Sequence, residues 1–116
     1  MKMSRGEEKV MKVIWDFEAR GEELVDLAKV VEQINLTYEI QWKSQTASTY
    51  LTRLTQKEYL DMRRERRGFY YRSLIDQKEY IEELFQDLSR FWYNRDPEAL
   101  QAAINEWKDS NNRTEV

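Results

Sequence analysis

The chain has 116 residues and a formal net charge of −3, and it contains neither cysteine nor histidine. A chain of this length forms one domain with a modest core. The two missing residue types exclude disulfides, thiolate metal sites and the ordinary catalytic groups that depend on histidine or cysteine.

The first predicted helix begins after Ser4, because Ser4 and Glu7 have the spacing of a capping box. Its apolar side consists of Val10, Met11, Ile14, Trp15 and Phe17. A break around Gly21 separates it from a second predicted helix. The core stripe of that helix consists of Leu27, Val30, Val31 and Ile34.

A third helix is predicted from Ser44, which is a suitable cap. Its apolar residues Ala47, Tyr50, Leu51 and Leu54 lie on one side. The opposite side carries amides and hydroxyls and is flanked by one guanidinium, whereas most exposed helix sides are rich in Glu and Lys. Such groups can read base edges and phosphates in a major groove. The preceding Trp42 is expected to be a core anchor, with base stacking as the alternative.

The next segment predicts a short antiparallel hairpin. Residues 59–64 and 69–72 are β-prone, and Gly68 is expected to provide the backbone freedom that the turn requires. Four arginines cluster at or beside the tip: Arg63, Arg64, Arg66 and Arg67. A solvated turn is the simpler interpretation of such charges. A polar reading helix followed by a basic hairpin nevertheless matches the order of a winged helix-turn-helix, and it favours DNA binding.

The chain resembles the penicillinase-repressor group of winged-helix transcriptional regulators, the BlaI/MecI/CopY type. The matching positions are residues 7–15, Trp42, Thr46, Thr49, Thr52, Arg53, Leu54, residues 59–60 and residues 69–74. The resemblance extends over about residues 3–93. It implies a mainly α fold with a small β wing, in which residues 22–25 supply a short strand before the second helix.

The chain departs from the family pattern at the start of the third helix and after its end. The family usually reads Trp-Ser-Pro-Lys-Thr, and this chain reads Trp-Lys-Ser-Gln-Thr, so Gln45 replaces a lysine that commonly approaches DNA. Glu58 stands where the family usually has glycine. Because glycine suits a left-handed residue after a helix, Glu58 implies either mild strain or a different turn.

Two further helices are predicted beyond the hairpin. Asp76 and Glu79 repeat the capping-box spacing, and Asp96 followed by Pro97 is a typical helix start. Residues 108–116 are expected to form a frayed tail. Residues 1–75 are therefore predicted to be a winged-helix DNA-binding domain, and residues 76–116 a C-terminal helical dimerisation region.

The charge distribution supports this division. Residues 43–72 contain 8 Lys or Arg against 3 Asp or Glu, whereas residues 76–116 contain 5 against 10. The basic charge is thus concentrated where a phosphate backbone would lie.

The predicted function is a sequence-specific repressor that binds a palindromic operator in double-stranded DNA as a homodimer. The predicted DNA-binding residues are Gln45, Thr46, Ser48, Thr49, Thr52, Arg53, Arg63, Arg64, Arg66 and Arg67. The predicted dimerisation residues are Ile81, Leu84, Phe85, Leu88, Phe91, Trp92, Leu100, Ile104 and Trp107. The alternative is a winged-helix protein–protein interaction module that does not bind DNA directly.

No catalytic constellation, metal site or cofactor motif is found, so an enzyme is not expected. No membrane-length apolar run or secretory signal occurs, and a cytoplasmic protein is expected. The resemblance also implies a sensor or protease that relieves repression. However, the copper-responsive relatives carry a C-terminal cysteine cluster that is missing here. The Asn-Phe cleavage motif of the β-lactam-responsive relatives aligns near Asp87-Leu88 and is not retained.

Overall fold

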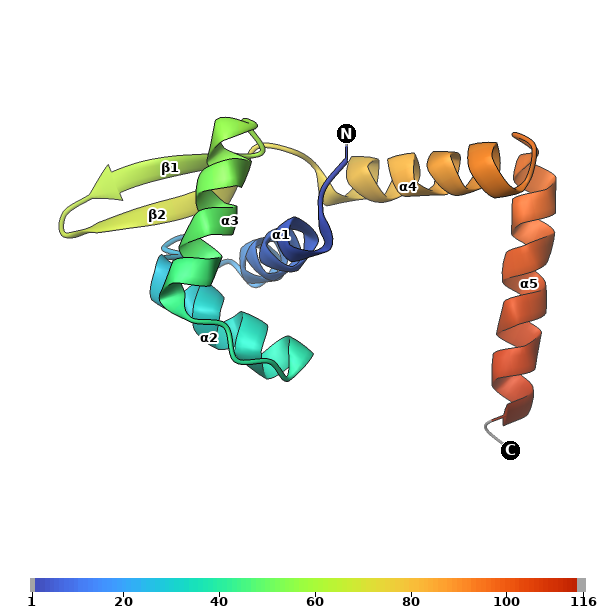
Figure 1. Ribbon diagram of the computed structural model, residues 1–116, viewed down its shortest axis with the longest axis horizontal. Helices are drawn as coiled ribbons and strands as arrows, with labels where there is room; N and C mark the ends of the chain where they lie inside the picture. Colours follow the sequence, from blue (N-terminus) through green and yellow to red (C-terminus); the bar gives the residue numbers. More distant parts are fainter. Residues whose placement is uncertain (1, 115–116) are drawn as a thin grey trace. The chain divides into compact units, whose positions relative to one another are not determined.

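The computed structural model describes residues 2–114 and contains seven regular elements in that part of the chain (Figure 1). They are α1 (Arg5–Ala19), α2 (Leu27–Tyr38), α3 (Ser44–Gln56), β1 (Leu60–Glu65), β2 (Gly68–Ser73), α4 (Gln77–Trp92) and α5 (Pro97–Thr114). Tertiary contacts divide the chain into two compact units, Met1–Gln77 and Lys78–Val116. The predicted fold class, mainly α with a small β wing, is confirmed.

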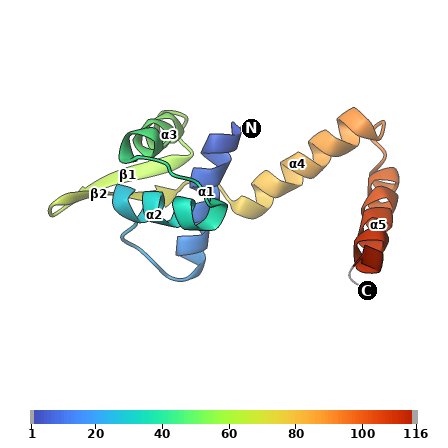
Figure 2. The ribbon, with the colours of Figure 1, turned by 60° about the horizontal axis from the view of Figure 1, so that its bottom comes forward.

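The N-terminal unit packs three helices around one core, and the hairpin leaves from its edge (Figure 2). The predicted apolar stripes point inward as expected. The largest side chains that are fully buried are Met11, Ile14, Ile34, Leu51, Leu54 and Leu60. Residues from α1, α2, α3 and β1 therefore contribute to the same core, which fixes the orientation of α3.

The start of α1 is tied to the end of α3 through Glu7. Ser4 and Glu7 form the predicted capping box, since each side chain accepts the other residue's backbone N–H. The Glu7 carboxylate is almost fully buried, and it also accepts a hydrogen bond from Lys57 Nζ at 2.7 Å. Burial opposes ionisation of this carboxyl, but the hydrogen bonds from Lys57 and Ser4 outweigh it and hold the pKa of Glu7 below its usual value. Glu7 is therefore ionised at neutral pH and joins two helices of the core.

The hairpin differs from the prediction in its turn. Glu65 pairs with Gly68, so the turn consists of Arg66 and Arg67 alone. The left-handed conformation falls on Arg66, with φ of 51°, and not on Gly68. The role predicted for Gly68 is therefore wrong. A Cβ at Gly68 would lie 3.3 Å from the Tyr70 hydroxyl, so its small size serves close packing within the hairpin.

The short strand expected over residues 22–25 does not form. This segment is irregular, and among the described residues the sheet has only β1 and β2. One backbone hydrogen bond joins it to the wing, from Tyr71 N–H to Val25 C=O at 2.9 Å. A single bond holds the segment beside β2, but it is too little to make a ladder.

The start of α3 also differs from the prediction. Ser44 is the first helical residue, and the cap position is Lys43, which has extended backbone angles and no capping side-chain bond. The Lys43 carbonyl accepts the backbone N–H groups of Thr46 and Ala47, so the helix begins one residue earlier than a Ser44 cap requires. The exposed backbone N–H groups of this first turn have no side-chain cap.

The end of α3 has the hydrogen bonds of a Schellman motif, from Tyr59 N–H to Leu54 C=O and from Glu58 N–H to Thr55 C=O. This motif places Glu58 in the left-handed region with φ of 64°. Of the two alternatives that the sequence left open, the strained residue is the one found.

Replacing Glu58 by glycine is expected to raise the free energy of unfolding by about 1 kcal/mol, because glycine adopts this conformation without steric cost. Urea unfolding measures the change. Glu58→Ala is the matched control, since it removes the same charge but keeps a Cβ. An equal gain in both variants would show that charge, and not backbone strain, is responsible.

The C-terminal unit consists of α4 and α5 and the connection between them. Asp96 caps α5 as predicted, accepting the backbone N–H of Glu98 at 3.0 Å. Asn94 and Arg95 both have left-handed backbones in the connection. The prediction of a frayed tail from Lys108 is wrong, because α5 continues to Thr114; residues 115 and 116 lie outside the described part.

Candidate nucleic-acid interface

The polar side of α3 is open to solvent. Gln45, Thr46, Thr49, Thr52 and Arg53 are exposed, and Ser48 is half-buried. The helix contains no acidic residue. The structure thus brings all six residues predicted for reading DNA onto one accessible helix that lacks negative charge.

One hydrogen bond limits what this surface can do. The Thr49 hydroxyl donates to the Gln45 backbone carbonyl at 3.0 Å. Thr49 therefore presents acceptor lone pairs and a methyl group, whereas the Gln45 amide keeps both donor and acceptor. Gln45 is the more versatile reader of base edges.

The turn before α3 is held by Asn35, a residue that the sequence did not single out. Its side chain accepts the Trp42 backbone N–H at 2.8 Å and donates to the Trp42 carbonyl at 3.0 Å. The Trp42 ring is half-buried and stacks on Tyr50, with ring centroids 5.1 Å apart. Trp42 thus supports α3 through this stacking from a half-buried position, and it does not lie in the buried core as predicted.

The same aromatic pair supports a predicted DNA contact. The Arg53 guanidinium lies 5.5 Å from the centroid of the Tyr50 ring. Arg53 is exposed and is flanked by an aromatic surface that restricts where its charge can lie.

The wing arginines do not form one group. Arg63, Arg64, Arg66 and Arg67 are all exposed. Arg63 alone of the four has a described ion pair, from its Nε to Asp61 at 3.3 Å, and the same carboxylate oxygen also accepts Nε of Arg72 at 3.0 Å. Arg64, Arg66 and Arg67 have no described ion pair, so they are better placed than Arg63 to bind an external phosphate.

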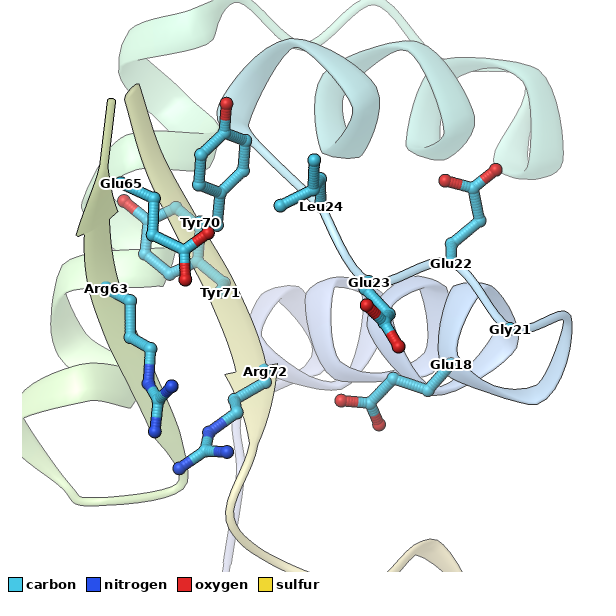
Figure 3. A pocket seen from close by; sticks show the side chains of 10 residues that line it. All are labelled: Glu18, Gly21, Glu22, Glu23, Leu24, Arg63, Glu65, Tyr70, Tyr71 and Arg72. Atoms are coloured by element: carbon cyan, nitrogen blue, oxygen red, sulfur yellow. The ribbon is translucent and has the colours of Figure 1, made fainter. Parts of the chain in front are cut away.

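Arg63 lies on the side of the wing that faces the α1–α2 connection (Figure 3). There the wing and residues 18–24 enclose a hollow of about 450 Å³. Its lining is mixed in charge and consists of Glu18, Gly21, Glu22, Glu23, Leu24, Arg63, Glu65, Tyr70, Tyr71 and Arg72. Glu18 fixes the base of the wing by accepting both the backbone N–H and the hydroxyl of Ser73, at 2.7 and 2.6 Å.

The residues predicted for dimerisation lie on α4 and α5. Ile81, Phe85, Leu88, Phe91, Trp92 and Trp107 are exposed, and Leu84, Leu100 and Ile104 are half-buried. Phe85 and Leu100 also line a hollow of about 360 Å³ in this unit. The chain alone does not bury this apolar surface.

Within residues 2–114, no group of three or more acidic, histidine or cysteine side chains is arranged to hold a metal ion. In the same part of the chain, no helix combines the length and apolar character that a membrane span needs.

A three-helix core with an exposed polar third helix and a two-stranded basic wing defines a winged helix-turn-helix protein, a class of nucleic-acid-binding regulators. The family model of the penicillinase repressor matches residues 3–114. The chain belongs to this family, whose members are transcriptional repressors and not enzymes.

Individual relatives agree with the family assignment. The chain is 32% identical over 92 residues to the penicillinase repressor of Bacillus licheniformis, across 79% of this chain and 66% of that protein. It resembles the solution structure of the DNA-binding domain of the repressor BlaI, with a TM-score of 0.54, 32% identity and coverage of 68% of this chain and 88% of that one.

A second solved structure is the monomeric form of Bacillus licheniformis BlaI in complex with the blaP half-operator. Its TM-score is 0.53 and its identity 31%, over 69% of this chain and 89% of that one.

Proposed function

We propose that this protein represses transcription by binding operator DNA as a homodimer, with α3 in the major groove and the wing on the adjacent backbone. The observation that carries the proposal is the exposed side of α3, which offers an amide, hydroxyls and Arg53 without any carboxylate. A major groove presents donors and acceptors to such groups, and a nearby carboxylate would be repelled by phosphate.

The solved complex of the related BlaI with a half-operator supports this placement, because that protein shares the fold and about a third of the aligned residues. In the proposed complex Gln45, Ser48, Thr49 and Thr52 face the base edges. Thr46 and Arg53 fix the register of α3, and Arg64, Arg66 and Arg67 contact the backbone from the wing.

A two-fold homodimer is the proposed assembly. The apolar residues of α4 and α5 provide its contact surface, and the symmetry places two reading helices on the two halves of a palindromic operator. A sensor or protease that ends repression would act on this dimer. The release step would differ from that of the relatives cleaved at an Asn-Phe bond, because this chain lacks that motif.

A protein-interaction module without DNA is the competing function. Such a module has no use for Arg64, Arg66 and Arg67, which are exposed together at the tip of the wing. An electrophoretic shift with the promoter of the protein's own operon separates the two. A retarded band that competitor DNA of random sequence does not remove supports the repressor, and no band supports the module.

Gln45→Ala is expected to weaken binding to the operator by about 1–3 kcal/mol, the usual contribution of one good base contact, and to change binding to random DNA much less. Fluorescence anisotropy with both kinds of DNA measures the difference. Gln33→Ala, which removes an amide from α2, is the control and should leave both affinities unchanged. An equal loss on both DNAs would mean that Gln45 does not read bases.

A further inference from the structure

The two faces of the wing differ in chemistry, and the strand register decides which residues share a face. Asp61 pairs with Arg72, Arg63 with Tyr70 and Glu65 with Gly68, so these residues alternate with the pairs Met62–Tyr71 and Arg64–Phe69. Arg63, Glu65, Tyr70 and Arg72 line the hollow beside the α1–α2 connection, and Tyr71, which the register assigns to the other face, also contributes to its lining. Met62, Arg64 and Phe69 are directed to the opposite face.

The face toward the hollow is close to neutral. Asp61 accepts from the Nε atoms of both Arg63 and Arg72. Glu65 and the glutamates of residues 18–23 lie around the same hollow. A phosphate that approached this face would meet carboxylates as well as guanidinium groups, so this face is a poor surface for DNA.

The opposite face combines an apolar surface with unopposed positive charge. Phe69 is 49% exposed and Met62 is 44% exposed. The Arg64 guanidinium lies 5.9 Å from the centroid of the Phe69 ring. Arg66 and Arg67 follow at the tip, and Glu65, the carboxylate next to them, is directed to the other face.

The position of this face relative to α3 identifies its partner. Figures 2 and 3 show α3 on the side of the hairpin away from the α1–α2 connection. The register directs Arg64 and Phe69 to that side, because Arg63 and Tyr70, which alternate with them, line the hollow beside the connection. A duplex lying along α3 therefore meets this face first. The wall of a minor groove is made of deoxyribose rings next to phosphates, which suits an apolar ring beside a guanidinium.

We propose that Arg64 and Phe69 form a two-part DNA contact, in which the Phe69 ring packs on deoxyribose of the minor-groove wall and Arg64 binds the adjoining phosphate. Arg63 takes no part in this contact. The inference rests on the proposed function, and it adds an apolar contact to a wing otherwise recognised only by its charge.

The two parts have different salt signatures. A phosphate contact releases counterions, so each one adds about 0.9 to the slope of log K against log salt. An apolar contact releases none. Phe69→Ala should therefore weaken operator binding about tenfold at every salt concentration. The variant loses the burial, on DNA binding, of the half of the phenylalanine side chain that is exposed in the free protein. Arg64→Ala should flatten the slope by about 0.9, as should Arg66→Ala at the tip.

The experiment measures operator affinity of the full chain by fluorescence anisotropy at several salt concentrations. Phe69→Leu should retain affinity within about threefold of the parent, because leucine keeps an apolar side chain of similar reach. Arg63→Ala and Tyr70→Ala, both on the face toward the hollow, should retain operator affinity within about twofold of the parent. Circular dichroism melting of each variant monitors the hairpin and the core.

Hydroxyl-radical footprinting provides a second measurement, because the radical attacks deoxyribose through the minor groove. The parent should protect sugars beside the segment covered by α3, and Phe69→Ala should lose that protection while keeping the rest of the footprint. Unchanged affinity of Phe69→Ala, or a loss of equal size in Tyr70→Ala, overturns the inference. If the parent chain itself does not prefer operator over random DNA, the proposed function fails instead.

Discussion

Replacing Phe91 and Trp92 together by alanine is expected to convert the proposed homodimer to a monomer at micromolar concentration. Phe91 is 76% exposed and Trp92 is 68% exposed in the single chain, with their rings packed edge to face at a centroid distance of 4.8 Å. Burying one such side chain contributes about 1.5–3 kcal/mol. A two-fold interface contains each residue twice, so the double substitution removes enough apolar contact to dissociate the dimer.

The same variant is expected to bind a palindromic operator about a hundredfold more weakly, while its affinity for a single half-site stays unchanged. Linking two reading helices makes the second binding event intramolecular, which multiplies affinity by about 10²–10⁴ without new contacts. Analytical ultracentrifugation gives the mass, and anisotropy with full and half operators gives the affinities.

Leu36→Ala is the matched control for this prediction. Leu36 is 68% exposed on α2, so it tests whether any large apolar residue on the surface causes association. It should leave both mass and affinity unchanged. A parent chain that is monomeric at micromolar concentration, or a double variant that stays dimeric, would contradict the proposed interface.

The core of the winged helix was predictable because periodicity carries its signal. Val10, Ile34 and Leu51 each belong to an apolar stripe of helical spacing on their own helix, and all three are fully buried. The ends of the elements were less predictable, because they depend on single backbone angles. The sequence places a serine at 44, but the extended residue that ends the turn is Lys43, and no side-chain preference identifies it.

The prediction for the hairpin turn is wrong for a similar reason. Glycine is the residue expected in a left-handed position, yet the register places that position on Arg66. The burial of Leu60 fixes which face of β1 points to the core, and this fixes the register. The end of α5 was not predictable because residues 108–114 are polar all round and give no periodic signal, although the helix continues through them.

The candidate site was predictable in composition but not in geometry. The unusual polar side of α3 is evident from residue types alone. The division of the wing is not, because Arg63 and Arg64 are neighbours in the sequence and only the register puts them on opposite faces. In the sequence, Phe69 belongs only to the β-prone run 69–72 and to the positions that match the family; the register is what pairs it directly with Arg64.

Replacing Gly6 by alanine is expected to lower the free energy of unfolding by about 1–3 kcal/mol, although alanine normally stabilises a helix by about 0.5–1 kcal/mol over glycine. The reason is Tyr50, whose Cε1 and hydroxyl would lie 2.6 Å from the new Cβ. The ring cannot move freely, because it stacks on Trp42. Displacing it also disturbs the surface beside Arg53, so operator affinity should fall as well.

A double-mutant cycle with Tyr50→Ala isolates this contact. In the Tyr50→Ala background the space beside Gly6 is empty, so Gly6→Ala should now stabilise the protein by about 0.5–1 kcal/mol, the ordinary helix preference. Urea unfolding of the four proteins measures whether the sign reverses between backgrounds. The same effect of Gly6→Ala in both backgrounds would mean that α1 does not position α3 through Tyr50. A reversal would establish that the close approach of Gly6 holds the aromatic support on which the reading helix rests.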